Sequence, residues 1–332
     1  MNTISLEEHT MKPVSVAGMA AFAVCIMIST HSWAWPDKPI RIIVPNAPGG
    51  GTDTIARSVA QKISPALGQP VVPDNRPGAG GQIAAEIVAR APKDGYTLLQ
   101  GSASALITGP ALYATRRYDP VKDFAPISLA ATTAYILATH PSVPATSMKD
   151  LIQLAKTQIG GLTYGSTGPG SSAHLGMELV QAMTGVKLIH VPFKGSSPAM
   201  VSLVSGEIDV MFGNYQATLA QIRAKRLKAL GQSTKVRSKL APDMPTIAES
   251  GLPGFEMRQF YSVVAPAGTP ADIVQRLNRE IVTHFDADDV RARLAAEGIE
   301  LETSTPEALG KLIAEQGALW AKVIAQAGVK VK

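Results

Sequence analysis

Two short apolar stretches of this sequence each end in a glycine-rich turn that leads directly into a longer amphipathic stretch. The first covers residues 40–44 and is followed by three consecutive glycines within residues 45–53. The second covers residues 162–164 and is followed by a turn at residues 165–172. Short β-branched runs predict buried strands, whereas apolar residues at spacings of three and four predict a helix. Strand, turn and helix in this order are typical of α/β folds with parallel sheets.

The same alternation continues along the chain and forms two similar halves. The first half predicts a βαβαβ order with strands at residues 40–44, 70–72 and 96–99. The second half begins near Tyr135 and predicts strands at residues 135–138, 162–164, 188–191 and 208–212, and the C-terminal part predicts a further strand at residues 261–264. Helices are expected between these strands, with Ser147 capping one of them, and at residues 270–284 and 306–327 near the end of the chain.

We therefore predict an α/β fold with two lobes, each a mostly parallel sheet flanked by helices. Residues 35–131 are expected to begin lobe one, residues 132–250 to form lobe two, and residues 251–332 to return to lobe one. Segments 127–138 and 227–254 would run between the lobes. Two crossing segments form a hinge, and a hinge between two lobes leaves a cleft.

The N-terminus carries an apolar run from Met19 to Ile28. This run is too short to span a bilayer, which takes about 20 residues, but it fits the apolar core of a signal peptide. Small residues before Trp35 provide a cleavage site, so residues 1–34 are predicted to be removed on export. Glu7 and Glu8 are atypical of such a segment, and Met11 followed by a lysine is an alternative start.

Composition limits the classes of function. The only cysteine, Cys25, lies in the predicted signal peptide, so the mature chain has no disulfide and no catalytic thiolate. The formal net charge is +5, and the densest basic run, at residues 223–228, is typical of the solvated face of a helix rather than of a nucleic-acid site. The histidines that remain after export show no metal-ligand spacing, and no G-x-S-x-G elbow occurs.

The two glycine-rich turns predict an anion site. Glycines allow close approach of the main chain, and the helix start behind each turn presents unpaired N–H groups with about half a positive charge. Ligands of open α/β sheets bind beyond the carboxyl ends of the strands, where these turns fall. The candidate ligand-binding residues are Asn46, Ala47, Pro48, Gly49, Gly50, Asp53, Ser102, Ser166, Thr167, Gly168, Gly170, Ser171, Ser172, His174, Phe193, Lys194 and Asn214.

Simpler structural roles remain open for several of these residues. The turns can be tight connections in which Thr52 and Ser171 cap the helices that follow. Asp53 either binds a ligand amine or complements the helix dipole, and His174 either reaches the ligand or serves as a capping or surface residue.

A nucleotide cofactor is not expected. Residues 168–173 formally fit the dinucleotide fingerprint G-x-G-x-x-A, but the next strand ends at residues 191–195 without the acidic residue that would bind the ribose. In the first turn Thr54 replaces the third glycine, and no GxxxxGK[ST] motif occurs. We predict no cofactor and no metal.

The whole mature length resembles the Bug-type substrate-binding receptors of tripartite tricarboxylate transporters. The matching stretches are residues 35–41, 49–57, 74–81, 93–99, 164–172, 190–195, 244–254 and 265–270. The resemblance implies a periplasmic binding protein of the type II-like, hinge-closing kind, whose two turns, at residues 45–53 and 166–172, grip one carboxylate through backbone groups and bridging waters. The family usually has an aromatic residue after the proline of the first strand, where this chain has Asn46. Because of this departure, the resemblance does not predict what lines the far end of the ligand pocket.

The resulting prediction is a periplasmic receptor, not an enzyme, that captures a small carboxylate and delivers it to the membrane subunits of a tripartite tricarboxylate-type transporter. We expect a monomer that does not bind nucleic acid. One alternative is a ligand-sensing receptor for a signalling partner, and a more remote one is a secreted α/β hydrolase.

Overall fold

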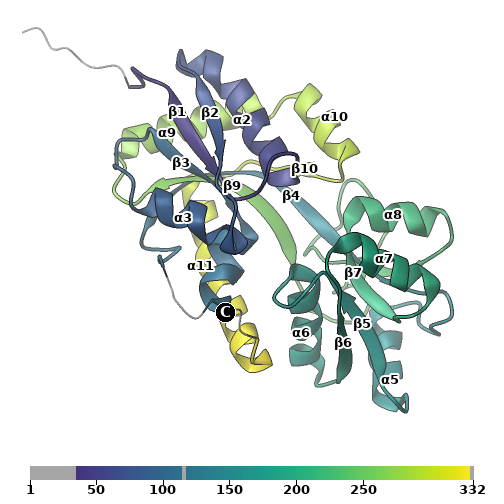
Figure 1. The fold of residues 1–332 in the computed structure, drawn as a ribbon. Coiled ribbons are helices and arrows are strands. Elements are labelled where there is room, and N and C mark those ends of the chain that lie inside the picture. Colours follow the sequence, from purple (N-terminus) through teal and green to yellow (C-terminus); the bar gives the residue numbers. More distant parts are fainter. Residues whose placement is uncertain (1–34, 114–116, 330–332) are drawn as a thin grey trace, which may run out of the picture. The chain divides into compact units, whose positions relative to one another are not determined.

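The strands join into one continuous sheet in the computed structural model, which describes residues 35–113 and 117–329. Within these residues the strand order is β2-β1-β3-β9-β4-β7-β5-β6, and β8 and β10 pair with β4 beside this path. All of these strands belong to one compact unit of the chain, which begins at Lys38. Its strands fall into two groups that share β4 (Figure 1).

The first group confirms the expected βαβαβ order. β1 (Ile40–Val44) pairs in parallel with β2 (Val71–Asn75) on one side and β3 (Thr97–Ser102) on the other. The connecting helices are α2 (Gly51–Leu67) and α3 (Gln82–Ala89), the latter preceded by the 3-10 turn η1 (Ala79–Gly81). The buried residues of α2 include Ile55, Val59 and Ile63, on the helical face that the sequence predicted.

The second group repeats the arrangement. β5 (Leu162–Ser166) pairs in parallel with β6 (Leu188–Pro192) and with β7 (Val210–Asn214). The helices of this part are α5 (Met148–Thr157), α6 (Ser172–Thr184), α7 (Ser196–Ser205) and α8 (Tyr215–Arg223). Ser147 caps α5 as predicted, because its side chain accepts a hydrogen bond from the backbone N–H of Asp150 at 3.1 Å.

β4 (Phe124–Thr139) connects the two groups. Its first part pairs antiparallel with β9 (Arg258–Pro266), and its last five residues pair antiparallel with β7 and, in part, with β8 (Lys228–Gln232). Each group is therefore parallel at its outer strands and antiparallel where it meets β4. This is the α/β architecture that the sequence predicted, with parallel pairs at the outer strands and antiparallel pairs around β4.

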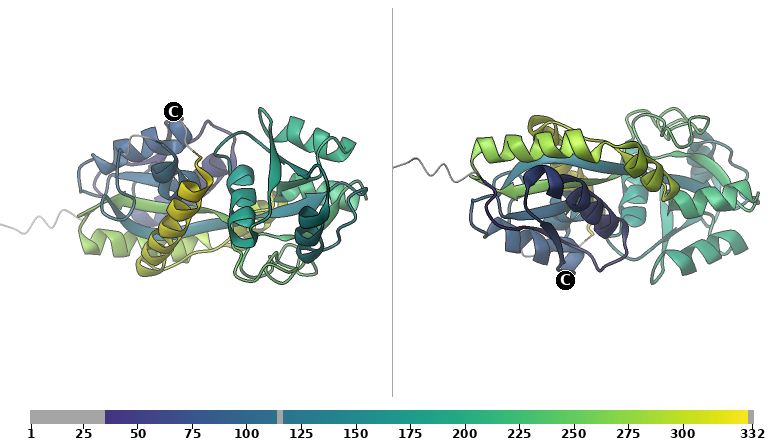
Figure 2. Two further views of the ribbon diagram at one scale, coloured as in Figure 1. Left: turned by 90° about the horizontal axis from the view of Figure 1, so that it is seen from below. Right: turned by 90° about the horizontal axis from the view of Figure 1, so that it is seen from above.

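The C-terminal segment returns to the first group. It comprises α9 (Ala271–Glu280) with a π-helical continuation η3 (Ile281–Phe285), α10 (Asp288–Ala296), β10 (Glu300–Leu301) and α11 (Pro306–Ala327). α11 contacts β4, α6 and the segment formed by η2 (Ser104–Thr108) and α4 (Gly109–Leu112), whereas α9 contacts β4 and α2. Figure 2 shows α2 and α9 in the view from above and α11, in yellow, in the view from below. The first strand group is thus covered on both faces.

The structure corrects some details of the sequence interpretation. Segment 227–254 is more than a crossing segment, because it contains β8, and the strand expected at residues 135–138 is much longer. α8, α10 and the segment η2–α4 had not been anticipated. The predicted signal peptide lies outside the described residues, and the lobe boundaries stay a prediction. Among the helices of residues 35–113 and 117–329, none is both long and apolar enough to cross a membrane.

Candidate ligand-binding site

Asp53 organises the loop between β1 and α2. Its carboxylate accepts hydrogen bonds from the Gly49 backbone N–H at 3.0 Å, the Arg57 Nε at 2.9 Å and the Asn75 Nδ2 at 3.0 Å. Asn75, at the end of β2, also donates to the Asn46 carbonyl at 2.9 Å. Asp53 is only 3% exposed, so it holds the loop from inside. The carboxylate is fully engaged by these three donors, which favours the structural role over binding of a ligand amine.

The charge of Asp53 is stabilised by the same contacts. Burial alone would raise the pKa of its carboxyl, but the hydrogen bonds from Arg57, Gly49 and Asn75 outweigh burial and lower the pKa below its usual value. Asp53 is therefore ionised at neutral pH and lies in the first turn of α2. α2 begins after Gly50 without a side-chain cap, so the proposed capping role of Thr52 is wrong.

The carboxyl ends of β1, β2 and β3 meet beside this loop. A Cβ on Gly81 would lie 3.0 Å from Pro45 and 3.1 Å from Ala105, so the turns that follow the three strands pack tightly. Ser102, at the end of β3, is 1% exposed and accepts a hydrogen bond from the Ala105 N–H at 3.2 Å. Its hydroxyl thus supports the turn, whereas residues 46–50 are exposed.

The loop between β5 and α6 is held by serine hydroxyls. Ser171 caps α6 as predicted, accepting the His174 N–H at 3.3 Å. Ser166, fully buried at the end of β5, accepts the Gly168 N–H at 3.1 Å and shares a hydrogen bond of 2.7 Å with His190 Nε2. Gly168 has a φ of +126°, a conformation that L side chains rarely adopt, so a glycine is required there.

His174 is buried, not a surface residue. It is 7% exposed, and its ring stacks on that of His190 with centroids 4.0 Å apart and an interplanar angle of 7°. Tyr164 also stacks on His190, with ring centroids 4.8 Å apart, and lies 6.3 Å from the His174 ring. The His174 Nδ1 accepts the Gly170 N–H at 3.0 Å. The stack therefore lies behind the glycine-rich loop and touches it at two points.

Two tyrosines that sequence reasoning missed stand beside the helix starts. A Cβ on Gly51, the first residue of α2, would lie 2.8 Å from the Tyr261 hydroxyl, so this glycine permits the close approach of Tyr261. Burial raises the pKa of Tyr261, and the nearby Tyr135 raises it further. Burial also raises the pKa of Tyr135, whose hydrogen bond with the Ser172 side chain acts in the opposite direction. Both phenols are protonated at neutral pH and can donate to an anion.

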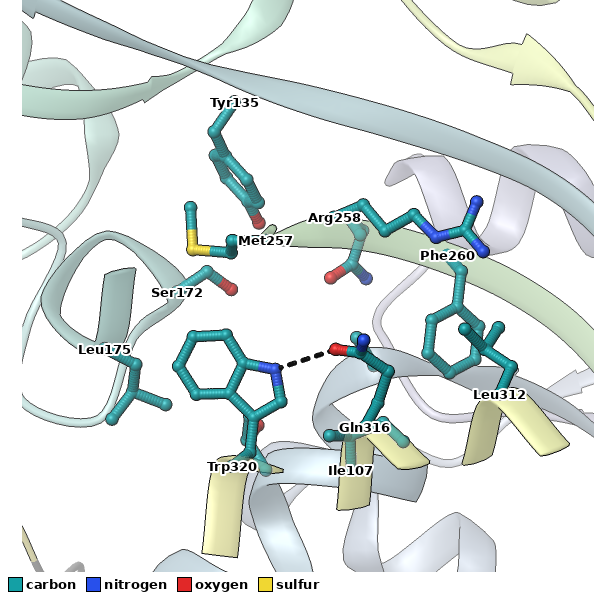
Figure 3. A pocket seen from close by; sticks show the side chains of 13 residues that line it. Ile107, Tyr135, Ser172, Leu175, Met257, Arg258, Phe260, Leu312, Gln316 and Trp320 are labelled. Atoms are coloured by element: carbon teal, nitrogen blue, oxygen red, sulfur yellow. Dashed lines mark hydrogen bonds between the residues drawn. The ribbon is translucent and has the colours of Figure 1, made fainter. Parts of the chain in front are cut away.

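A small pocket lies where α6, β4, β9 and α11 meet (Figure 3). The side chains of Trp320 and Gln316 point into it from α11, and the Trp320 Nε1 donates to Gln316 Oε1 at 3.3 Å. Its volume is only ≈ 20 Å³, about that of one or two waters and too little for an organic acid. Apolar side chains such as Phe260 and Leu175 form most of its wall.

A roomier cavity of ≈ 170 Å³ adjoins the start of α6. Tyr135 and Ser172 line both cavities, so the two are neighbours. The larger one also includes Thr167, Ser196 and Asn214, which offer hydroxyl and amide groups of either polarity. This volume suits a small carboxylate group and its water, so the larger cavity is the better candidate for the ligand.

The structure brings together only part of the predicted site. Thr167, Ser172 and Asn214 line the larger cavity, and Phe193 packs behind the same loop, its N–H donating to the Ser166 carbonyl at 3.0 Å. Lys194 is exposed next to it. Neither cavity includes a residue of the β1–α2 loop. Asn46, Ala47, Pro48, Gly49 and Gly50 therefore stay predicted ligand contacts, and so do Gly168, Gly170 and Ser171 in the second loop.

The fold consists of two α/β strand groups that share one long strand, and each group has a glycine-rich loop at the start of a helix. This is the architecture of a solute-binding receptor. The sequence matches the family described as "Tripartite tricarboxylate transporter family receptor" over residues 55–329. The chain belongs to this family, whose members are periplasmic receptors. This confirms the resemblance found in the sequence.

Individual relatives agree with this assignment over nearly their whole lengths. Protein BugT of Bordetella pertussis is 36% identical over 320 residues, which cover 96% of this chain and 98% of BugT. The structure of R. palustris Rpa4515 with adipate is 36% identical, with a TM-score of 0.71, and covers 89% of this chain and 99% of that one. The structure of MatC from Rhodopseudomonas palustris with bound malate is 32% identical, with a TM-score of 0.69, and the match covers 87% of this chain and 100% of MatC.

Proposed function

We propose that this chain binds a small carboxylate, of the dicarboxylate class, between its two glycine-rich loops. One observation carries the proposal: the loops open α2 and α6, and a protonated phenol stands beside the first residue of each helix. Tyr261 lies beside Gly51, and Tyr135 beside Ser172. A helix start contributes about 0.3–1 kcal/mol to anion binding, and up to about 2 kcal/mol when partly buried. Two helix starts and two hydroxyl groups thus offer one carboxylate group both N–H and O–H donors.

The relatives support the class of ligand. Two solved family members, each at least 32% identical, hold adipate and malate, which are dicarboxylates. Polar groups of Thr167, Ser196 and Asn214 in the larger cavity favour a polar far end in the ligand of this chain as well. Asn46, in place of the family's usual aromatic residue, is consistent with that polarity.

The transport role completes the proposal. Residues 1–34 direct export and are removed, so that the mature receptor works in the periplasm as a monomer and delivers its ligand to transporter subunits in the membrane. Residues 35–131 and 251–332 form one lobe and residues 132–250 the other, with β4 and the segment before β9 as the hinge. The receptor acts by binding alone and catalyses no reaction.

Calorimetric titration of the mature protein with C4 to C6 dicarboxylates and matched monocarboxylates tests the ligand class. We expect micromolar or tighter binding of at least one dicarboxylate and weaker binding of the monocarboxylate of the same length. Binding of none of these acids would contradict the proposal, and so would equal affinity for monocarboxylates and dicarboxylates.

The substitution Gly51→Ala tests the location of the site. The added Cβ would meet the Tyr261 hydroxyl at 2.8 Å, so Tyr261 must move away from the start of α2. We expect about a tenfold loss of affinity, equivalent to about one hydrogen bond. Gly317→Ala is a matched control, because Gly317 also lies in a helix and a Cβ there would meet nothing within 4 Å. An unchanged affinity of Gly51→Ala would place the ligand elsewhere.

A further inference from the structure

Two stacked imidazoles lie behind the β5–α6 loop, and the proposed carboxylate binding assigns them no role. His174 comes from α6 and His190 from β6, and they are far apart in the sequence but 4.0 Å apart between ring centroids. Each ring touches the glycine-rich loop through one nitrogen. Neither His174 nor His190 lines the larger cavity, so they reach the ligand only through the loop.

The contact of His174 fixes its tautomer. Its Nδ1 accepts the Gly170 N–H at 3.0 Å, and an accepting nitrogen carries no proton. The proton of the neutral ring is then on Nε2, which faces Glu178 Oε1 at 3.6 Å. A second proton, on Nδ1, would oppose the Gly170 N–H and push residues 168–170 away from the ring. The conformation of the loop thus requires a neutral His174.

The contact of His190 passes through a hydroxyl. Ser166 Oγ is 2.7 Å from His190 Nε2 and also accepts the Gly168 N–H at 3.1 Å. Its single proton points either to His190 or to the Gly168 carbonyl, 3.2 Å away. In either arrangement the hydroxyl joins the ring to Gly168. Ser166 is fully buried, so water cannot take over these bonds.

We propose that His174 and His190 are positioning residues of the carboxylate site, which as a neutral stacked pair hold Gly170 and Gly168 so that the start of α6 faces the ligand. The proposal rests on the proposed function of the loop as an anion site. It assigns the pair no contact with the ligand. The amides of Gly168 and Gly170 are already occupied by the pair and by Ser166, and the His174 N–H donates to Ser171, which leaves the N–H groups of Ser172 and Ala173 at the start of α6 for the anion.

The surroundings of His190 support its neutral state. Burial and the neighbouring His174, which would repel a second positive charge, together lower the pKa of His190 to about 4 against the opposing effect of Glu178. Tyr164 from β5 and Glu178 from α6 are the other titratable groups that face the pair, and the Tyr164 hydroxyl donates to Glu178 at 2.6 Å. Because the pKa of His190 is lowered, its neutral form persists well below neutral pH and is lost only in acid.

Nuclear magnetic resonance on the ligand-free mature protein tests the pair without any ligand. With ¹⁵N-labelled histidine and glycine, we expect His174 Nδ1 to be unprotonated and coupled across the hydrogen bond to the Gly170 amide. His190 should stay neutral at pH 5. His140 and His284, which lie outside the stack, provide reference signals. A protonated His174 Nδ1, or a His190 that is charged at pH 6, would overturn the proposal.

Matched substitutions test the effect on binding. The Oδ1 of asparagine replaces the Nδ1 of histidine, and the side-chain amide of glutamine replaces Nε2. We therefore expect His174→Leu and His190→Leu to lose about tenfold in affinity for the best dicarboxylate, one hydrogen bond each. His174→Asn and His190→Gln should recover most of that loss. If the leucine and amide variants lose affinity equally, the rings act only as packing and the proposal fails.

The two experiments separate this proposal from the proposed function. If the wild-type protein binds no dicarboxylate, the carboxylate function fails, whereas the resonance measurements still decide whether the pair holds the loop. If the wild type binds a dicarboxylate and His174→Leu binds it equally well with its thermal stability unchanged, the positioning role is wrong and the receptor function stands.

Discussion

Asp53 is buried, and three hydrogen-bond donors contact its carboxylate. Replacing it by asparagine keeps the size but removes the charge, and the amide nitrogen then opposes one of the donors. We expect Asp53→Asn to lower the free energy of unfolding at pH 7 by about 1–3 kcal/mol, the cost of unsatisfied buried partners of a charged group. Urea denaturation followed by circular dichroism measures the difference.

The effect of Asp53→Asn has a defined pH dependence. The pKa of Asp53 is lowered in the folded state, so its stabilising contribution is complete above the unfolded value of about 4 and is lost as the pH falls through the lower folded value. The difference between wild type and variant should therefore shrink below about pH 4. Asp243→Asn, at an exposed position, is the control and should change stability by less than about 0.5 kcal/mol. A difference that stays constant down to pH 3 would show that charge is irrelevant at Asp53.

Residue roles were only partly predictable from the sequence. The glycine-rich turns and the cap Ser171 follow from local rules, because backbone conformation and helix starts leave signatures in neighbouring residues. The positions of Tyr261 and of His190 depend on which strands pair, and no local pattern encodes that pairing. Asp53 was recognised as important, but only its contact with Asn75, from the next strand, distinguishes a structural from a ligand-binding role.

At the scale of elements, a single serine joins three strands at the middle of β4. The Ser233 hydroxyl accepts the Tyr135 N–H at 2.9 Å, its own N–H donates to the Tyr135 carbonyl, and its carbonyl accepts the Met257 N–H at 2.7 Å. Ser233 follows β8, Tyr135 lies in β4, and Met257 precedes β9. This fully buried residue therefore joins the segments that we propose as the hinge.

Removal of this hydroxyl should loosen the connection. Ser233→Ala leaves the Tyr135 N–H without its partner in a buried site, which costs about 1–3 kcal/mol. We expect a loss of stability in that range, together with faster hydrogen exchange at the Tyr135 amide. Ser197→Ala, at an exposed position of α7, should leave both quantities nearly unchanged. Unaltered exchange at Tyr135 in Ser233→Ala would show that the hydroxyl does not hold β4.

Element order was predicted well, and β7 and β9 beside β4 were expected, but β8 and β10 were not. β1 reads IRIIV, which is close to the continuous apolar run expected of a parallel strand that is buried on both faces. β8 is as long as β1 but reads KALGQ, which is too polar for such a pattern, and Gly231 has a φ of +156° where the pairing with β4 shifts register. Long-range pairing with β4 creates this strand, so its sequence alone gave no signal.

At the scale of the whole molecule, a ligand held by both glycine-rich loops must protect both of them. Because it binds only the folded state, a ligand at 100 times its Kd raises the free energy of unfolding by about 2.7 kcal/mol. That gain is global and does not identify the loops. Hydrogen exchange does, because closure around the ligand shields the amides of residues 46–50 and 166–171 together while leaving fully exposed segments as they were.

We therefore expect saturating dicarboxylate to slow exchange in both loops, although they lie more than 100 residues apart in the sequence. The turn around Ile159, whose side chain is fully exposed, serves as the internal control and should exchange at the same rate with and without ligand. Protection of residues 166–171 alone would mean that only the second loop holds the anion, as the larger cavity by itself would allow. Protection of both loops requires closure, because neither cavity includes a residue of the β1–α2 loop.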